Sequence, residues 1–194
     1  MDSTIRVGIL SDTHMPGSLR EMWPEVGQAF DGVDLILHSG DICHPSVLDQ
    51  LEQWAPVLAC RGNNDYFPTG DPRVEDEVRI DLHGFRIAMV HDMEPEGEPI
   101  AELCQRYLRG APADVMVTGH THFERLDFRA GVLQVNSGSA VHPHLWSTRL
   151  GTVALLEVGP GSLRASVVRL GQTEGLRNPG RELVFDGVAV HTVS

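Results

Sequence analysis

Short apolar runs separated by polar clusters organise the first 118 residues of the chain. These runs are rich in Val, Ile and Leu and predict buried strands. They cover residues 5–10, 33–37, 57–60, 85–90 and 115–118. Between the runs, residues 24–30, 45–54 and 99–109 carry helix signals. Strand and helix therefore alternate, which predicts parallel units in this half of the chain.

The segment 99–109 has the clearest helical pattern, with one apolar stripe that stops at Gly110. The stripe consists of Ile100, Leu103, Cys104, Tyr107 and Leu108. Residues 24–30 and 45–54 each begin with a proline, which suits the first position of a helix. We therefore expect three helices between the strands.

After His122 the pattern changes to closely spaced strand candidates, which favour antiparallel pairing. They cover residues 123–128, 132–135, 152–158 and 163–168, with turns at 129–131 and 159–161. The combination predicts an α/β fold: a four-layer α/β/β/α sandwich of two mixed β-sheets flanked by helices. We expect one domain over residues 1–170. Residues 171–194 are expected to form a C-terminal extension whose apolar stretch, 183–190, adds an edge strand.

The composition narrows the classes of partner. Of the 194 residues, 15 are Lys or Arg and 27 are Asp or Glu, giving a net charge of −12, so we expect no polymeric nucleic acid partner. No apolar run approaches the roughly 20 residues of a membrane-spanning helix, and the first residues do not resemble a secretion signal. We expect a cytoplasmic protein without a membrane partner, and a homo-oligomer stays open. Cys43, Cys60 and Cys104 are odd in number and lack CxxC spacing, which argues against disulfides or a cysteine zinc site.

Each predicted strand of the first half is followed by residues of the types that bind metals. The clusters are Ser11-Asp12-Thr13-His14, Gly40-Asp41, Gly62-Asn63-Asn64-Asp65, His91-Asp92 and Gly119-His120-Thr121-His122. Since the carboxyl ends of parallel strands meet at one sheet edge, these clusters should converge. Seven candidate ligands are too many for one ion, so the pattern predicts a polynuclear site. The mixture of nitrogen and oxygen donors suits Mn, Fe, Zn, Ni or Co better than Ca or an all-oxygen Mg site.

In order and spacing, these motifs resemble those of the calcineurin-like metallophosphoesterases. The chain length and the sequence Gly62-Asn63-Asn64-Asp65 are similar to the small bacterial and archaeal phosphodiesterases related to the retromer subunit Vps29. The resemblance covers roughly residues 5–158 and does not include the C-terminal extension. Five motifs in the same order are more specific than any one of them alone.

The resemblance implies two divalent ions per chain, with Mn²⁺ expected and Zn, Fe, Ni, Co or Mg as alternatives. Asp12, His14, Asp41 and His122 would hold one ion, and Asp41, Asn63, His91 and His120 the other, with Asp41 as the bridge. The nucleophile implied is a hydroxide that bridges the ions. Two such ions with two aspartates leave a local charge of about +2, which attracts a phosphate ester despite the acidic composition.

Further residues are expected around these ligands. Asn64 would bind a phosphate oxygen, and Asp65 would orient a ligand from behind. His142 and His144, in a loop after Asn136-Ser137-Gly138-Ser139, are candidates for substrate contact. His38 is expected to be a hydrogen-bonded core residue, and packing is the default role of Cys43; His44, His83 and His191 receive no role.

Two positions depart from the family pattern. Many of its members have histidine where this chain has Asn64, which weakens general acid catalysis. Relatives often read His-Gly-His around the fourth motif, whereas this chain has His91-Asp92-Met93, so Asp92 and Met93 are expected to change the rim of the site.

The function expected is therefore hydrolysis of a small phosphate ester, with a phosphodiester as the preferred substrate class. A phosphomonoesterase or a nucleotide pyrophosphatase at the same site is an alternative, because loops decide specificity. A binding scaffold like Vps29 is another alternative. Such scaffolds can lose metal ligands, whereas this chain keeps all seven residues.

Overall fold

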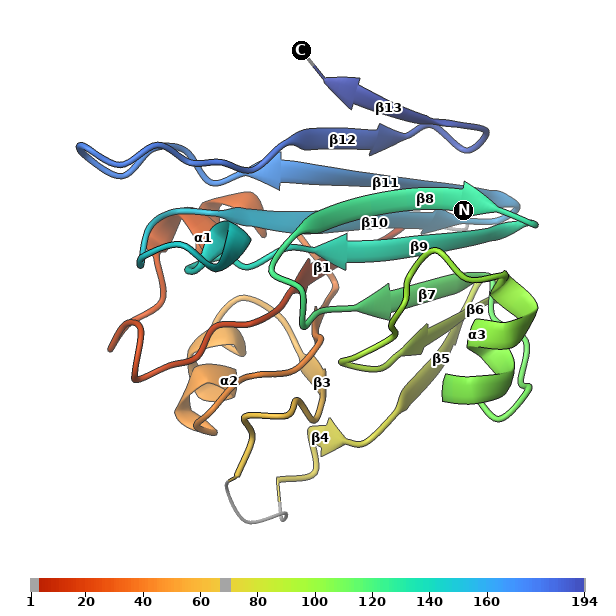
Figure 1. Cartoon of the computed structure of the whole chain (residues 1–194), viewed down its shortest axis with the longest axis horizontal. Coiled ribbons are helices and arrows are strands. Elements are labelled where there is room, and N and C mark those ends of the chain that lie inside the picture. Colours follow the sequence, from red (N-terminus) through yellow and green to blue (C-terminus); the bar gives the residue numbers. More distant parts are fainter. Residues whose placement is uncertain (1–3, 67–70, 194) are drawn as a thin grey trace.

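The computed structural model describes residues 4–66 and 71–193, and these form two stacked β-sheets (Figure 1). The larger sheet has eight strands in the order β13, β12, β11, β10, β1, β2, β3, β4. In chain order they are β1 (Ile5–Leu10), β2 (Leu35–His38), β3 (Val57–Cys60), β4 (Val74–Glu75), β10 (Thr152–Gly159), β11 (Ser162–Arg169), β12 (Glu182–Phe185) and β13 (Val190–Val193). The smaller sheet, in the order β5, β6, β7, β9, β8, consists of β5 (Val78–Leu82), β6 (Phe85–Met89), β7 (Val115–Thr118), β8 (Glu124–Arg129) and β9 (Val132–Ser137).

Helices cover the outer face of each sheet. α1 (Pro24–Ala29) and α2 (Ser46–Leu51) pack against the larger sheet through a core that includes Phe30, Leu48 and Ile36. α3 (Ile100–Tyr107) packs Leu103 against Met116 of the smaller sheet. A short 3-10 helix, η1 (Pro143–Leu145), lies in the connection between the sheets.

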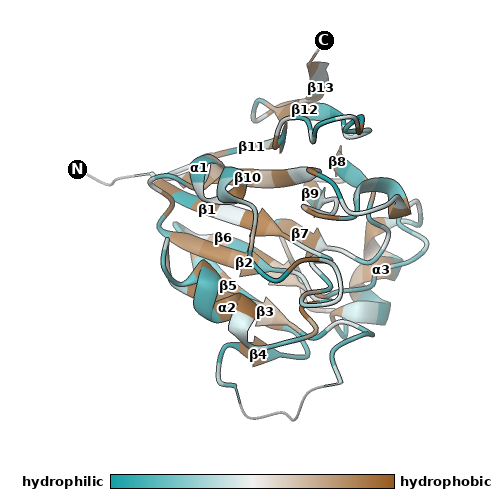
Figure 2. Cartoon of the chain, turned by 90° about the vertical axis from the view of Figure 1, so that its left-hand side faces the viewer, coloured by the Kyte–Doolittle hydropathy of each residue, from teal (hydrophilic) through white to brown (hydrophobic). Residues whose placement is uncertain are grey.

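The main core lies between the two sheets. Ile9 and Leu156 of the larger sheet belong to one buried apolar cluster with Met89, Val117 and Val135 of the smaller sheet. Figure 2 shows the same division, with hydrophobic residues along β2, β3 and β6 and hydrophilic ones on the surface of α2. The order of layers is α/β/β/α with mixed sheets, so the predicted fold class is confirmed.

The second half of the chain is divided between the sheets. β8 and β9 pair antiparallel in the smaller sheet, where β9 also runs parallel to β7. β10 and β11 pair antiparallel in the larger sheet, where β10 also pairs with β1. The antiparallel hairpins agree with the sequence pattern, but the sheet that each one joins does not follow from it.

Two features of the smaller elements were not expected from the sequence. The edge strand β5 alternates buried Val78 with exposed Arg79, so it lacks the continuous apolar run of the central strands. In the extension, the apolar stretch 183–190 is split into β12 and β13. Oδ1 of Asp186 accepts hydrogen bonds from the backbone N–H groups of Val188 and Ala189, both at 2.9 Å, and turns the chain there.

β12 joins the extension firmly to the rest of the molecule. It pairs with β11, and Leu183 and Phe185 are buried in the core between the sheets. The division at residue 170 stays a prediction, which a truncation can test. Among the described helices, none has the length and apolar character needed to cross a membrane.

The parallel strands of both sheets end at one common edge. The backbone N–H of Ser39, after β2, donates to the carbonyl of Leu10 at the end of β1. The hydroxyl of Ser39 donates to the carbonyl of Thr118 at the end of β7, at 2.9 Å. These bonds hold the loops of the two sheets together.

Candidate metal centre

The seven predicted ligands lie together at this edge. Asp12 and His14 follow β1, Asp41 follows β2, and Asn63 follows β3. His91 follows β6, while His120 and His122 follow β7. The loops after β1 and β2 are joined by two backbone hydrogen bonds, from Asp12 N to Gly40 O at 3.0 Å and from His14 N to Asp41 O at 2.9 Å.

A first group of donor atoms lies around His14. Its Nε2 atom is 3.2 Å from Nε2 of His122 and 3.5 Å from Oδ2 of Asp41. Nε2 of His122 is also 3.5 Å from Oδ1 of Asp12. The donor atoms of Asp12, His14 and His122 thus lie within 4.8 Å of one another.

A second group lies around His91 on the other side of Asp41. Its Nε2 atom is 3.5 Å from Oδ1 of Asp41 and 2.9 Å from Oδ1 of Asn63. The same Asn63 oxygen is 2.9 Å from Nδ1 of His120. The two oxygens of Asp41 thus face different groups, and donor atoms of Asp12, Asp41 and His91 also lie within 4.8 Å of one another.

The separations fit divalent cations. Metal–nitrogen bonds of about 2.1 Å place neighbouring ligand atoms about 3.0–3.4 Å apart, close to the 2.9–3.5 Å found here. Oδ1 of Asp12 is buried and has no hydrogen-bond partner, whereas Oδ2 accepts the backbone N–H of His120 at 3.0 Å. A divalent cation at this position would satisfy the orphaned oxygen.

Hydrogen bonds also set the tautomers of two histidines. Nδ1 of His91 donates to the carbonyl of Ser39 at 2.7 Å, and Nδ1 of His122 donates to the carbonyl of His142 at 2.9 Å. In its neutral form, each ring then presents the lone pair of Nε2 to its group. In the second group, that lone pair faces the carbonyl oxygen of Asn63, so two acceptors meet without a proton between them.

Burial favours the neutral form of two of the ligand imidazoles, His14 and His122. Burial lowers the pKa of His14, and burial lowers that of His122 to about 4. Burial raises the pKa of Asp41, but the nearby His91 imidazole and two hydrogen bonds from Asn64 outweigh it and bring the pKa below its ordinary value. Burial raises the pKa of Asp12 well above its ordinary value, so a cation is needed to hold that carboxylate ionised.

The local backbone is strained at these residues. Five of the seven ligands have positive φ angles, although none is glycine: Asp12 (54°), His14 (48°), Asp41 (56°), His120 (67°) and His122 (60°). Such conformations cluster at functional sites. Close packing also excludes side chains from two motif glycines: a Cβ on Gly62 would lie 2.2 Å from Asp41 N, and one on Gly119 would lie 1.9 Å from Ser11 Oγ.

Asn64 and Asp65 both act on the Asp41 loop. Asn64 donates its backbone N–H to Oδ1 of Asp41 at 2.8 Å and its amide to Oδ2 at 2.6 Å. Asp65 is buried and accepts backbone N–H groups from Asp41 (3.0 Å), Cys43 (2.6 Å) and Gly62 (2.7 Å). Asp65 thus positions the ligand loops without touching a ligand side chain.

His38 and Cys43 lie behind the ligands. His38 is fully buried, and its Nε2 atom is 3.1 Å from the hydroxyl of Thr13. The Cys43 sulfur is 3.8 Å from Nδ1 of His14, and burial raises the pKa of its thiol to about 11, so the thiol is neutral.

The two loop histidines, His142 and His144, lie in different surroundings. His142 lines the cavity above the ligands, with its ring centroid 6.0 Å from that of His14. His144 does not line this cavity. Its Nε2 atom lies 2.8 Å from the buried carboxylate of Glu124, and its ring stacks on Phe123.

The cavity has a volume of about 450 Å³ and combines donor atoms with apolar surface. It is lined by His14, Asp41, Asn63, Asn64, His120, His122, His142, Leu145 and Trp146. The sequence gives no signal that distinguishes Leu145 and Trp146 from core residues, because an apolar pair has the same pattern when buried. Glu124 was missed for a similar reason, since its partners lie far away in the chain.

The expectation that Met93 alters the rim is not met. Met93 is buried against α3, in one cluster with Leu103, so it is a packing residue. Asp92 is exposed and lies near Glu94 and His120, where three donor atoms come within 4.8 Å of one another.

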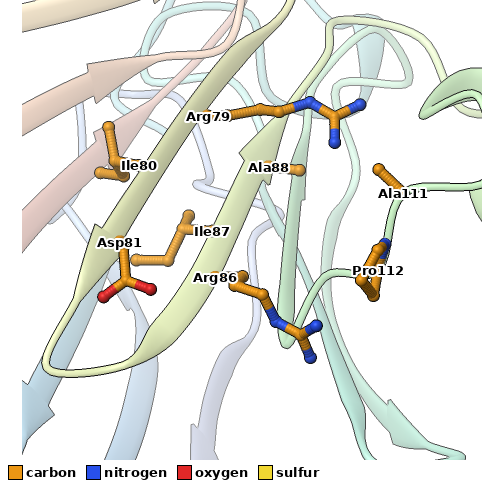
Figure 3. Close-up of a pocket in the computed structure, with 8 residues that line it drawn as sticks. All are labelled: Arg79, Ile80, Asp81, Arg86, Ile87, Ala88, Ala111 and Pro112. Carbon is orange, nitrogen blue, oxygen red and sulfur yellow. The ribbon is translucent and has the colours of Figure 1, made fainter.

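A second cavity, of about 410 Å³, lies away from the metal ligands beside β5 and β6 (Figure 3). Arg79 and Arg86 flank it, with Ala111 and Pro112 on the opposite side. Both guanidinium groups are engaged: Arg79 donates to the carbonyl of Leu108, and Arg86 forms two hydrogen bonds with the Asp114 carboxylate. This cavity offers mainly apolar walls and contains none of the predicted ligands.

Comparisons with known proteins agree with this arrangement. Residues 5–161 match the model of the calcineurin-like phosphoesterase superfamily domain. A probable metallophosphoesterase of Methanothermobacter thermautotrophicus is 33% identical over 168 residues, covering 85% of this chain and 92% of the relative.

Solved structures show the same fold. Vacuolar protein sorting 29 of Cryptosporidium parvum superposes with a TM-score of 0.73 at 22% identity, covering all of both chains. Vps29 of Entamoeba histolytica, complexed with Zn²⁺, gives a TM-score of 0.68 at 21% identity and covers 97% of each chain. The family model matches most of the sequence, and residues of metal-ligand types lie together at one sheet edge of this chain. The chain therefore belongs to the calcineurin-like phosphoesterase superfamily.

Proposed function

We propose that the protein is a phosphodiesterase with two divalent metal ions per chain. The observation that carries the proposal is the position of Asp41, whose Oδ2 faces His14 while its Oδ1 faces His91. A single carboxylate with one oxygen in each of two donor groups supports a binuclear centre. The candidate site residues are those of the sequence prediction, with Asp65 as a positioning residue.

Two divalent ions bound there would polarise the phosphate and lower the pKa of the attacking water. The chain's own residues prepare the site for them. Neutral His14 and His122 offer lone pairs, and the hydrogen bonds to Asp65 hold the loops after β2 and β3 against each other. Mn²⁺ is our first choice of ion because the donors are mixed nitrogen and oxygen. The Zn²⁺ complex of the Entamoeba Vps29 supports the capacity of this fold to hold a divalent cation.

Asn64 would contribute in two ways. Its amide lies against Asp41 and also lines the cavity, so it can donate a hydrogen bond to a phosphate oxygen. An amide cannot give a proton to a departing alkoxide. The proposed reaction therefore favours esters whose leaving group is stable as an anion.

His142 remains a candidate for substrate contact, because its ring is in the cavity. For His144 we propose a supporting role instead, since its ring is held by Glu124 and Phe123. The substrate would be a small phosphate ester, and we place the protein in the cytoplasm, in keeping with its three free cysteines.

A Vps29-like scaffold is the second candidate, favoured by the structural likeness to two Vps29 proteins. A phosphomonoesterase or a nucleotide pyrophosphatase would use the same donor groups. These functions differ in whether the bound metal supports turnover, and on which ester.

The test combines metal analysis with an activity panel. We expect elemental analysis of Mn²⁺-loaded protein to approach two ions per chain, and chelator to abolish hydrolysis of an aryl phosphodiester. Asp41→Asn should reduce metal content and lower kcat/KM at least 100-fold, whereas Asp76→Asn, at an exposed aspartate, should change neither. Full activity in chelator, or one ion per chain in both wild type and Asp41→Asn, would refute the binuclear enzyme. Tight metal binding without turnover of any ester would favour the scaffold.

A further inference from the structure

The cavity above the metal ligands is larger and more apolar than a phosphate group requires. Its volume of about 450 Å³ falls in the range of about 300–1,000 Å³ typical of sites for whole small molecules. Five of the seven donor residues line it, and the two apolar residues of the lining, Leu145 and Trp146, are termed its apolar wall. These two residues are 67% and 46% exposed, although large apolar residues are normally buried.

Trp146 is held in place rather than loosely exposed. The Arg149 guanidinium lies over the indole ring, 5.0 Å from its centroid, and Arg149 is itself buried. Arg149 donates to the carbonyls of Ser147 and Arg177, both at 3.1 Å. The backbone N–H of Trp146 donates to Pro143 O at 3.1 Å. An aromatic surface fixed in this way loses little entropy when a ligand binds.

The loop that carries this wall is joined directly to a metal ligand. The carbonyl of His142 accepts from Nδ1 of His122, and the backbone N–H of His144 donates to the carbonyl of His122 at 3.0 Å. His144 and Leu145 both have positive φ angles, 54° and 61°, a costly backbone for consecutive non-glycine residues.

Contacts to a buried carboxylate anchor the other side of the loop. Glu124 has a fully buried side chain and contacts His144 Nε2 at 2.8 Å. It also accepts hydrogen bonds from the backbone N–H and the Nε atom of Arg181, both at 3.0 Å. The position of the apolar wall relative to the metal ligands is therefore fixed from both sides.

We propose that Leu145 and Trp146 bind an aromatic group of the ester substrate, so that the preferred substrates are phosphodiesters bearing an aryl or nucleobase ring. This inference rests on the proposed function and specifies its substrate class. The ring would stack on the indole while the phosphate lies over the donor groups, because both surfaces line one cavity. Trp146 is then the residue that determines specificity.

The experiment compares two esters with the same leaving group, phenyl p-nitrophenyl phosphate and methyl p-nitrophenyl phosphate. Both release p-nitrophenolate, so the ratio of their kcat/KM values reports on the group that is retained. We expect Trp146→Ala to lower this ratio about tenfold, the usual size of an aromatic stacking contact, mainly through KM. Trp146→Phe should restore most of it. Tyr66→Ala is the matched control, because Tyr66 is 86% exposed and does not line the cavity.

A binding measurement separates this inference from the proposed function. Calorimetry with phenylphosphonate and methylphosphonate needs no turnover, and metal content is measured in each variant. If wild type cleaves neither ester, the proposed function fails, but tighter binding of phenylphosphonate that depends on Trp146 still supports the aromatic site. Equal affinities for the two phosphonates would overturn the inference. So would a ratio that stays within twofold in Trp146→Ala or falls equally in Tyr66→Ala.

Discussion

Replacing Asp65 tests whether hydrogen bonds behind the metal ligands hold the ligand loops in place. Asp65 is 5% exposed, and its two oxygens accept three backbone N–H groups. Oδ2 accepts from Asp41 and Gly62, while Oδ1 accepts from Cys43. The loops after β2 and β3 are therefore tied to one carboxylate.

Asp65→Asn changes this arrangement by one atom. The best orientation of the amide keeps its oxygen at the Oδ2 position and retains the bonds from Asp41 and Gly62. Its NH₂ group then faces the N–H of Cys43, so one hydrogen bond to a charged acceptor is lost and two donors oppose each other. A lost bond of this kind costs about 1.5–3 kcal/mol, and we expect a loss of about 2 kcal/mol in the free energy of unfolding. Asp65→Ala loses all three bonds and should cost more than twice as much.

The assay is urea unfolding of the metal-free protein. With a slope near 2 kcal/mol per molar urea, a loss of about 2 kcal/mol moves the midpoint by about 1 M. Mn²⁺ should stabilise Asp65→Asn less than wild type, because the Asp41 loop is displaced and binding is weaker. Asp76→Asn is the control, since Asp76 is exposed and pairs only with Arg61 among the described contacts. An unchanged midpoint and unchanged Mn²⁺ affinity in Asp65→Asn would show that these hydrogen bonds do not position the ligand loop.

Three further predictions concern acidity, the extension and the leaving group. Burial lowers the pKa of His38 to about 3 from an ordinary value of 6.5, so the unfolded state binds the extra proton and stability should fall as pH drops below about 6.5. In His38→Gln, the slope of the unfolding free energy against pH should be smaller by the contribution of one proton, about 1.4 kcal/mol per pH unit. Urea unfolding from pH 7 to 4 measures this slope. An unchanged slope would contradict the assignment. Truncation after residue 170 removes buried Leu183 and Phe185, each costing about 2–5 kcal/mol when its side chain is lost, so thermal unfolding should reveal a severely destabilised protein. A truncated chain as stable as the full one would instead support an independent domain over residues 1–170. Because Asn64 offers no acidic proton, kcat/KM should depend steeply on leaving-group pKa across a series of aryl phosphodiesters, and Asn64→His should flatten this dependence if the imidazole reaches the leaving oxygen. A flat dependence in wild type with chemistry rate-limiting would reveal another general acid, and His142 would be the first residue to replace.

The sequence by itself determined the strands that carry the site and the residues at their ends. Runs such as 115–118 are buried on both faces, so their apolar pattern is visible without any knowledge of their neighbours. The ligand types follow directly after these strands, and the parallel arrangement sends all the clusters to one edge. For that reason Asp12, Asp41 and His91 could be placed together before any coordinates were known.

Only the tertiary structure decided how the atoms at that edge are directed and what surrounds them. The tautomer of His91 depends on the carbonyl of Ser39, 52 residues away in the chain. His142 and His144 are two residues apart, yet only His142 lines the cavity. The ring of His144 contacts Glu124, which lies outside the loop. Met93 was assigned to the rim and proved to be buried against α3. Lone-pair direction and burial depend on partners that are distant in sequence, and no local pattern records them.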